Sequence, residues 1–596
     1  MNRKQHQDAH LAPLRSLPAS ALRAVLRDGY GRDQLKQDLM AGLVVGVIAL
    51  PLAMALAIGV GVPPQHGLYT AIVAGLVIAL LGGSRMQVSG PTAAFIVVLA
   101  PIYSRFGLRG LLLSGLMGGA MLVAMGVLRF GRLIQFIPHP VTTGFTAGIA
   151  TVIATLQLKD VLGLSVPRDS PHFLEKVGIL AGSLGTASPW EALVAAFTLA
   201  ALLVTPRITR RVPAPLIALP LAALLAFLLS RFVPGVELAT IANRFQVEIG
   251  GKTVMGIPQL PPLPIAPWAA PASETWSFNF ETLRALAAGG FAIAILGAIE
   301  SLLSAVVADG MAHTKHDPDS ELLAQGVGNL LLPFFGGIPA TGAIARTAAN
   351  VRAGAVSPIA AALHAVVVLA AVLALAPLLG YLPMAALAAL LLVVAWNMSE
   401  ARHFVHTLRV APKSDVTVLL TCYALTVSFD MVVGVSVGMV LAALLFMRRM
   451  AEVVHTKLSQ RVPEAPEPAP EGVLFYQISG PLFFGAAQKA MATLESIGKQ
   501  ARVVILILNE VHAMDATGEV ALESVLRHLR EQRCKVVLTG VCPQPLLVLK
   551  KAHLEEQPGV YFSDTVAEAL EIARGELERE PVLKSRPAWL GSTDGS

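Results

Sequence analysis

Long apolar runs separated by short polar or Gly/Pro-rich breaks dominate the first 450 residues. About 20 apolar residues are needed for a helix to cross a bilayer, so this pattern predicts fourteen membrane segments. The proline-rich polar stretch 233–282 divides them into two halves of seven. The segments expected in the first half are about 39–60, 68–81, 85–100, 111–128, 141–158, 190–204 and 216–232. Those expected in the second half are about 286–307, 322–334, 336–351, 358–378, 384–396, 416–429 and 431–446.

Two of these segments are interrupted. Residues 85–100 begin with a short strand-like run at 86–88, turn at Ser89-Gly90 and continue as a helix. We expect Pro91 to open that helix, because a missing N–H is no loss at the first helical position. Residues 336–351 repeat this order with a Gly/Pro break, a small hydroxyl residue and a short helix. A kink in a packed helix would explain either segment alone, but a pair at corresponding places in two halves favours a transport site.

Broken helices have chemical consequences at membrane depth. Non-helical backbone is tolerated there only where it is buried in protein or lines a cavity. A helix N-terminus in such a cavity carries free N–H groups and a partial positive charge, and it therefore suits an anion. The sequence thus predicts two short helices that point their N-termini across one pocket inside the bilayer.

Composition supports a polytopic membrane protein rather than a soluble enzyme. The 596 residues are 55% hydrophobic and only 14% charged. The net charge of +6 arises largely beside apolar runs, where basic residues act as orientation signals and not as a nucleic-acid surface. The basic stretch before the first segment and Arg448-Arg449 after the last place both termini in the cytoplasm of a bacterial inner membrane. The three cysteines indicate no disulfide framework.

The chain divides by composition into five parts. Beyond the apolar region, the PEAPEPAP sequence indicates a stiff linker. Alternating strand and helix patterns after it predict a small α/β domain, with strands near 472–479, 503–508 and 535–539. The expected parts are a cytoplasmic N-terminal segment 1–36, a membrane domain 37–450, a linker 451–471, the α/β domain 472–580 and a tail 581–596.

Two ionisable residues of the membrane segments are candidates for the site. A charged side chain at the centre of a membrane helix costs about 2.5–3.5 kcal/mol or more, so Glu300 must face a cavity or a partner. It could be a structural acid, or it could ligate a proton or Na⁺ together with Ser301 and Ser304. Arg346 lies one to two turns into the second short helix and would attract an anion, whereas Arg352 suits a membrane interface. The alternative for Arg346 is a purely structural pair with Glu300.

A charge count suggests how the site would work. Each helix N-terminus supplies roughly half a positive charge, and Arg346 adds a full one. The site is therefore near +1 when Glu300 is ionised and near +2 when it is protonated. We hypothesise that protonation of Glu300 prepares the site for a dianion, which would couple anion uptake to protons.

Other polar stretches carry weaker signals. The loop 313–321 holds two histidines and several acids, but their spacing favours a solvated loop over a metal site. In the α/β domain, Asp515 and Thr517 lie in a DATG sequence between a strand and a helix. Thr517 could be a phosphorylation site there, although an ordinary helix N-cap is the simpler interpretation. No Walker-type phosphate loop occurs, so neither a cofactor nor ATP-driven transport is expected.

Nearly the whole chain resembles the SulP family of anion transporters. The matching sequences are LPLAMALAIGVGVPPQHGLYTA, GGSRMQVSGPTAAF, LGAIESLL and FFGGIPATGAIARTAANVRAGAVSP, and the C-terminal unit with its DATG resembles a STAS domain. The resemblance implies two inverted repeats of seven segments, with segments one to four and eight to eleven forming a core that moves against a gate. It places substrate between the third and tenth helices, at Ser89, Gly90, Pro91, Thr92, Ala93, Ala94, Phe95, Thr341, Gly342 and Ala343, with Arg346 and Glu300 nearby.

Within that family, ESLLSAVVADGM, SELLAQGVGNLLLPFFGGI and AALLLVVAWNMSEA resemble the bacterial C4-dicarboxylate transporters of the DauA type. The resemblance implies a homodimeric secondary active transporter that imports succinate, fumarate or aspartate by proton symport, with an elevator-like motion. Relatives that take up bicarbonate with Na⁺ tend to carry Asp at the position of Glu300. The alternatives are sulfate or bicarbonate uptake through the same site, an anion channel, or a scaffold that acts through a cytoplasmic protein partner of the STAS domain.

Overall fold

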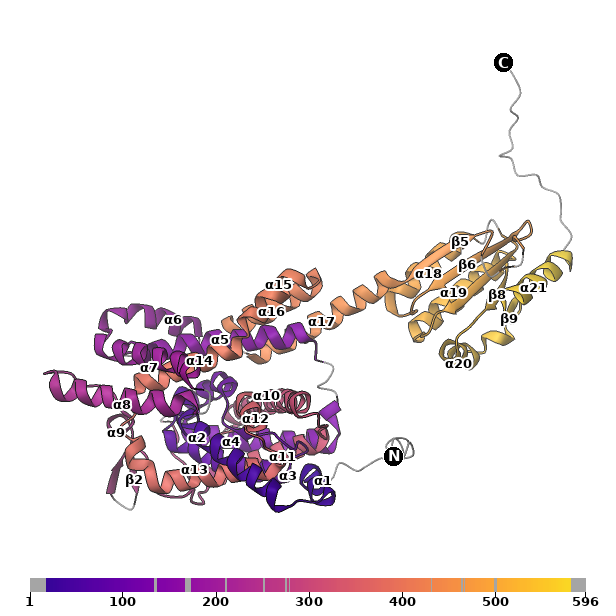
Figure 1. The fold of residues 1–596 in the computed structure, drawn as a ribbon. Helices are drawn as coiled ribbons and strands as arrows, with labels where there is room; N and C mark the ends of the chain where they lie inside the picture. Colours follow the sequence, from indigo (N-terminus) through magenta and orange to yellow (C-terminus); the bar gives the residue numbers. More distant parts are fainter. Residues whose placement is uncertain are drawn as a thin grey trace. The chain divides into compact units, whose positions relative to one another are not determined.

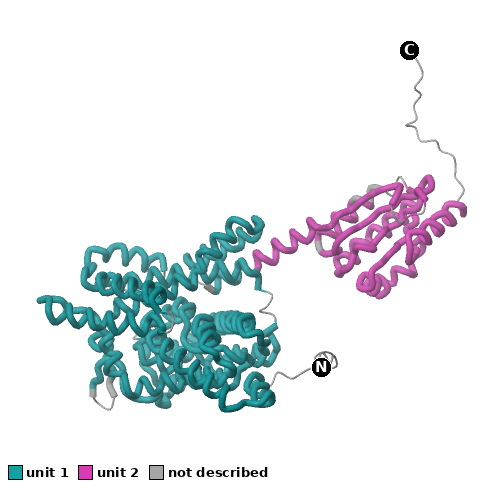
Figure 2. The backbone as a smooth tube through the Cα atoms, viewed as in Figure 1, with its two compact units in different colours: residues 1–439 teal, residues 440–596 magenta. Residues whose placement is uncertain are grey.

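The chain forms two compact units, Met1–Met439 and Val440–Ser596 (Figures 1 and 2). Residues 1–17 of the expected N-terminal segment and the whole expected tail 581–596 lie outside the described residues. The computed structural model describes residues 18–132, 137–166, 173–209, 212–249, 252–273, 276–277, 279–429, 431–462, 465, 467–497 and 501–579.

The first unit is helical, and each expected membrane segment corresponds to a helix or half-helix. Within the described residues, ten helices are long and apolar enough to cross a membrane. The first half comprises α2 (Arg32–Val60), α3 (Pro64–Leu81), β1 (Ser89–Gly90), α4 (Ala93–Val127), α5 (His139–Val161), α7 (Pro189–Ile208) and α8 (Ala214–Phe232). The second comprises α10 (Phe280–Ala312), α11 (Pro318–Leu331), β4 (Thr341–Gly342), α12 (Ile344–Arg352), α13 (Pro358–Leu379), α14 (Met384–Ser399), α16 (Lys413–Ser428) and α17 (Met431–Val453).

The third and fourth expected segments meet inside α4. Gly107 has φ 69° and ψ −168°, a left-handed backbone conformation that breaks the helix and that glycine tolerates because it has no Cβ. The helix that follows the first interruption therefore runs through Pro101 and ends at this kink, some residues later than the sequence predicted.

The helices of this unit pack in two groups. One group joins α2 and α3 to α13, and α4 to α10 and α11; the other joins α5 to α14 and α16, and α7 to α8 and α14. Small residues permit these contacts, since a Cβ on Gly144 of α5 would lie 2.6 Å from the carbonyl oxygen of Leu419. The grouping follows the division into core and gate segments that the family resemblance implied.

Several shorter elements lie where the sequence predicted irregular chain. The expected N-terminal tail contains α1 (Ser20–Asp28), which buries Ala21 and Val25, and α2 begins before the predicted first segment. The expected polar stretch 233–282 is partly structured. It holds α9 (Ile241–Arg244), a hairpin of β2 (Gln246–Ile249) and β3 (Lys252–Met255), and η5 (Pro267–Ala269). The remaining short helices are α6 (Phe173–Gly182), η4 (Leu184–Thr186), η6 (Leu332–Phe335) and α15 (Ala401–Val410).

The second unit is built on a five-stranded sheet in the order β5-β6-β7-β8-β9. The strands β6 to β9 are parallel, and β5 pairs antiparallel with β6. Since β5 pairs in the sheet, the expected linker 451–471 contributes a strand of the domain. The elements are β5 (His455–Ser459), β6 (Val473–Ser479), α18 (Phe484–Ile497), β7 (Val503–Glu510), α19 (Ala516–Glu531), β8 (Lys535–Thr539), α20 (Pro543–Lys551), η7 (Leu554–Glu556), β9 (Val560–Ser563) and α21 (Val566–Arg579).

Both faces of this sheet are buried, as expected for parallel strands flanked by helices. On one face, Leu506 and Leu508 of β7 pack with residues of α18 and α19. On the other face, Ile505 and Ile507 pack with Leu570 of α21. The strand β7 accordingly consists almost entirely of apolar residues until its last two positions.

Candidate anion site at the paired interruptions

The two interrupted segments are joined directly through their backbones. β1 and β4 pair antiparallel, with Ser89 opposite Gly342 and Gly90 opposite Thr341. The N–H of Ala343 extends the ladder by donating to the carbonyl of Val88 at 2.9 Å. The segments that the sequence predicted as partners are therefore neighbours, although they lie about 250 residues apart.

The structure corrects two local details of the first interruption. The strand is Ser89–Gly90 and not residues 86–88, because Ser89 and Gly90 are the residues that pair with β4. The helix begins at Ala93, so Pro91 does not open it. Thr92 precedes the helix in an extended conformation, with φ −126° and ψ 158°, and Pro91 forms the connection from β1.

Neither helix that leaves this strand pair has a side-chain cap. Thr92 precedes α4 and Ala343 precedes α12, and within the described residues neither helix has a side-chain hydrogen bond that caps its first turn. The first N–H groups of a helix have no partner within the helix, so both starts leave donors for another acceptor. Because α4 and α12 follow two strands of one ladder, these donors belong to the same small region. Ala93, Ala94, Phe95 and Ala343 are all buried there.

Arg346 ties the second short helix to the first interruption. Its side chain is buried, with only 3% exposed, and Nη2 donates to the carbonyl oxygen of Pro91 at 2.5 Å. Its Nη1 has no hydrogen-bond partner among the described residues. A Cβ on Gly90 would lie 2.6 Å from Nη1, so the close approach of the guanidinium requires glycine at this position.

Glu300 of α10 contacts Thr92, which directly follows the Pro91 that Arg346 contacts. Its Oε2 accepts a hydrogen bond from the hydroxyl of Thr92 at 2.8 Å, and both residues are half-buried. The described residues include no ion pair between Glu300 and Arg346, so the structural pair considered from the sequence is not formed. The carboxylate and the guanidinium instead hold Thr92 and Pro91, on either side of the same peptide bond.

The serines near Glu300 hold the second interruption. Oγ of Ser301 lies 2.7 Å from Oγ1 of Thr341 and accepts a hydrogen bond from the N–H of Gly342 at 3.0 Å. Ser304 was expected to bind a proton or Na⁺ together with Glu300. Its Oγ lies 3.0 Å from Oγ1 of Thr347 on α12. Thr347 in turn accepts from the N–H of Val88 at 3.0 Å. The described contacts of Ser304 are thus with the second short helix.

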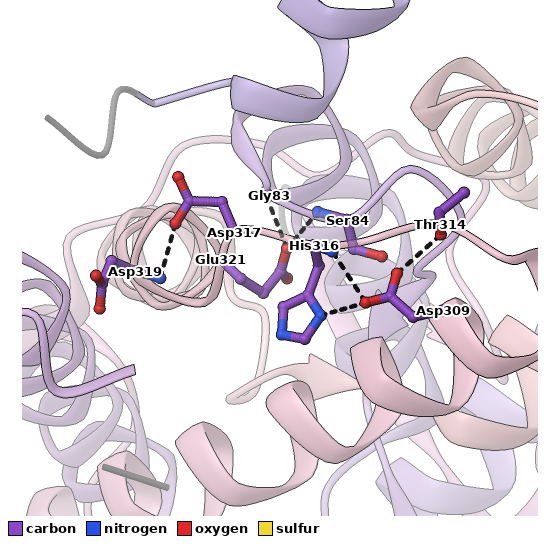
Figure 3. Close-up of polar contacts among 8 residues, drawn as sticks. All are labelled: Gly83, Ser84, Asp309, Thr314, His316, Asp317, Asp319 and Glu321. Atoms are coloured by element: carbon purple, nitrogen blue, oxygen red, sulfur yellow. Dashed lines mark hydrogen bonds and ion pairs between the residues drawn. The ribbon is translucent and has the colours of Figure 1, made fainter. Parts of the chain in front are cut away.

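The loop 313–321 is solvated only in part: His313 and Lys315 are exposed, whereas residues 319–321 are buried (Figure 3). Nδ1 of His316 lies 2.7 Å from Oδ2 of Asp309, and both side chains are largely buried. Asp317 accepts hydrogen bonds from the N–H groups of Asp319 and Ser320 and so caps α11. The reason is tertiary: the N–H of Asp317 donates to the carbonyl of Gly83, which fixes the loop against the segment before β1.

Sequence reasoning missed the polar side chains behind the strand pair. Gln87, Glu321, Gln325 and Asn329 are buried and hydrogen-bonded to the interrupted segments. A signal was present, since Glu321, Gln325 and Asn329 recur at four-residue intervals in a stretch whose other residues, 322–331, are apolar or glycine.

In the α/β domain, Asp515 and Thr517 lie at the start of α19. Oδ1 of Asp515 accepts a hydrogen bond from the N–H of Gly518 at 2.8 Å, which is the geometry of an N-cap. Thr517 is exposed in the first turn. This arrangement provides the N-cap that the sequence allowed, and modification of Thr517 stays a prediction.

The fold and site define a membrane protein whose interrupted helices meet at a buried arginine, as in a carrier for small anions. Comparison with known families agrees: the sulfate permease family matches residues 35–422, and the STAS domain matches residues 466–569. The chain therefore belongs to the sulfate permease family, and it is an anion transporter rather than an enzyme.

Individual relatives cover most of the chain. It is 39% identical over 532 residues to the "Putative sulfate transporter YvdB" of Bacillus subtilis, covering 89% of this chain and 96% of that protein. It is 29% identical over 548 residues to the bicarbonate transporter BicA of Picosynechococcus, covering 87% and 91%. The structure of murine Slc26a9, an anion transporter in the inward-facing state, shares the fold with a TM-score of 0.79 at 19% identity, covering 94% of each chain.

Proposed function

We propose that the protein is a secondary active transporter that imports a small dianion together with protons. The observation that carries this proposal is Arg346, which is buried beside two helix starts; among the described residues, Nη1 has no partner and neither helix start has a side-chain cap. An unpaired guanidinium nitrogen in a buried site is costly unless a ligand completes its hydrogen bonds. An anion that accepts from Nη1 and from backbone N–H groups would do so.

Sulfate and C4-dicarboxylates are the substrates that fit this proposal. Sulfate is favoured by the 39% identity to a relative named as a sulfate transporter. Succinate, fumarate and aspartate are favoured by the subgroup sequences around Glu300 and α11. Sulfate, succinate and fumarate are dianions, and aspartate presents two carboxylates although its ammonium group lowers its net charge to −1. These substrates suit the chemistry that the site offers, which is one cation and two sets of N–H donors. Bicarbonate carries a single charge, so it makes less use of a site that reaches about +2.

Glu300 is the proposed proton-binding residue. Its carboxyl group is hydrogen-bonded to Thr92, directly before the first turn of α4. A negative charge at that place opposes the entry of a dianion, and protonation removes it. Uptake would then proceed with a proton on Glu300, and release would follow when the proton leaves. An elevator-like motion of the core group of helices against the gate group would carry the anion and the proton across the membrane.

The proposal also covers the membrane location and the assembly of the protein. We infer that both termini lie in the cytoplasm of a bacterial inner membrane, and the basic residues before the first membrane segment and after the last one support this. We infer a homodimer with a cytoplasmic protein partner at the STAS domain. Crosslinking in intact membranes tests the dimer, and a dimer band absent at every crosslinker length contradicts it.

Uptake into proteoliposomes tests the transport proposal. Radiolabelled sulfate and succinate are supplied with and without an inward proton gradient, and saturable, concentrative uptake of at least one is expected. Arg346→Ala should abolish that uptake. Arg352→Ala is the matched control, because Arg352 is an exposed arginine at the end of the same helix and should leave uptake intact. An ohmic anion current, or uptake unaffected in Arg346→Ala, contradicts the proposal.

A further inference from the structure

One face of α11 carries three polar side chains that the proposed transport cycle does not use. Glu321, Gln325 and Asn329 are spaced four residues apart, so they lie one above another along the helix. Each is at most 1% exposed. Buried polar groups are costly unless they are hydrogen-bonded. The hydrogen-bond partners of these three residues therefore show which segments they position.

Glu321 holds the chain that leads into β1. Its Oε2 accepts hydrogen bonds from the N–H groups of Gly83 at 2.9 Å and Ser84 at 3.2 Å. Its Oε1 accepts from the side-chain amides of Gln87 at 2.9 Å and Gln325 at 3.1 Å. Figure 3 shows the carboxylate turned toward Gly83 and Ser84. Four donors converge on one carboxylate, which fixes the backbone between α3 and β1.

Gln325 holds β1 itself. Its Nε2 donates one hydrogen to Oγ of Ser89 at 2.8 Å and the other to Glu321. Both hydrogens of the amide are therefore used. Ser89 is the first residue of the strand, so this contact sets the place at which β1 begins.

Asn329 holds the second interruption. Its Nδ2 donates to the carbonyl oxygen of Ala340 and its Oδ1 accepts from the N–H of Ala340, both at 2.8 Å. The side-chain amide thus pairs with this backbone as a neighbouring strand would. Ala340 directly precedes β4, so both interruptions are held by the same helix face.

The helix that carries these three residues is closely packed. A Cβ on Gly119 of α4 would lie 2.7 Å from the backbone N of Leu330, and one on Gly326 would lie 2.5 Å from the backbone N of Val123. These contacts show that α11 lies directly against the backbone of α4. By contrast, β1 and β4 are only two residues long, and so short a strand pair is marginal without support.

We propose that Glu321, Gln325 and Asn329 form a positioning ladder that sets the relative placement of the starts of α4 and α12, and hence the affinity of the site for its anion. The three are positioning residues, since they act through β1 and β4. The effect on anion affinity rests on the proposed function, whereas the effect on the backbone does not.

Hydrogen exchange of the full-length protein in detergent tests the backbone part. In Glu321→Met, the amides of Gly83 and Ser84 lose the one oxygen that accepts from both, and in Asn329→Leu the amide of Ala340 loses its acceptor. We expect exchange at 83–84 and at 340, respectively, to accelerate about tenfold. Asp319→Asn is the matched control. Asp319 is a buried acid on the same helix, but it accepts from the N–H of Gly131 instead.

Uptake kinetics test the affinity part with whichever of sulfate or succinate the wild-type protein transports. The ladder variants should raise KM about tenfold with a much smaller change in maximal rate, and Gln325→Met should do the same if the larger changes prevent folding. Equal KM in all folded variants, or an equal rise in Asp319→Asn, overturns the proposal. Wild-type protein that transports neither anion contradicts the proposed function, and the exchange experiment then decides the ladder alone.

Discussion

The close contact between Gly90 and Arg346 allows a sharp test of the anion site. In Gly90→Ala, the new Cβ would lie 2.6 Å from Nη1, 3.1 Å from Nη2 and 3.3 Å from Cζ of Arg346. Ordinary van der Waals contact begins at 3.4 Å, so the guanidinium must retreat by about 0.8 Å. The end of an arginine side chain can make this movement without shifting the backbone, and the fold should survive.

The displacement moves Nη1, the nitrogen proposed to donate to the anion, and should therefore weaken that hydrogen bond in the anion-bound state. Hydrogen bonds that involve a charged group contribute about 1.5–3 kcal/mol. Loss of that contribution from the bound state corresponds to roughly a 10- to 150-fold change in affinity. We therefore expect KM for the transported anion to rise by roughly 10- to 150-fold, while the thermal unfolding temperature changes by only a few degrees.

The matched control is Gly310→Ala. Gly310 is another glycine of the first unit, in α10, but a Cβ there would meet no atom within 4 Å. Uptake by this variant should equal that of the wild-type protein. The reasoning fails if Gly90→Ala folds and takes up its anion with an unchanged KM.

Three further predictions concern protons, the α/β domain and thiol reactivity. Glu300→Gln should flatten the dependence of uptake on pH. Thr92→Val should shift that dependence, because it removes the hydrogen bond to Glu300. Profiles of uptake against pH that match the wild type in both variants would exclude Glu300 as the proton-binding residue. Asp515→Ala should destabilise the start of α19 by about 0.5–2 kcal/mol, measurable as faster hydrogen exchange there, and unchanged exchange would exclude a capping role. Burial raises the pKa of the Cys534 thiol to about 11, so only about one thousandth is thiolate at pH 8. Iodoacetamide at pH 8 should therefore modify the more exposed Cys542 and spare Cys534, and equal labelling of both would contradict this.

The interrupted helices were predictable because their signal is local. A Gly/Pro break in a short apolar run marks non-helical backbone wherever it occurs, and its recurrence in the second half indicated a shared site. Arg346 and Glu300 were predictable for a similar reason, since ionisable residues in apolar segments are costly. The structure places both beside the first interruption, on Pro91 and Thr92.

Features that depend on distant partners were not predictable in this way. Residues 86–88 have strand-like composition, but pairing with β4 assigns the strand to Ser89–Gly90. The strand β5 was expected to be linker, because only its pairing with β6 identifies it. The loop 313–321 has the composition of solvated chain, yet contacts with Gly83 and Ser84 bury its acids. Composition indicates only the average environment of a residue type, whereas the structure of these residues is set by partners far away in the sequence.

A structure determined by electron cryomicroscopy with saturating sulfate or succinate tests the anion site most directly. We predict density for the anion within hydrogen-bonding distance of Nη1 of Arg346 and of the backbone N–H groups that begin α4 and α12. Anion density at another place in the membrane unit, with Nη1 of Arg346 still unpartnered, would contradict it.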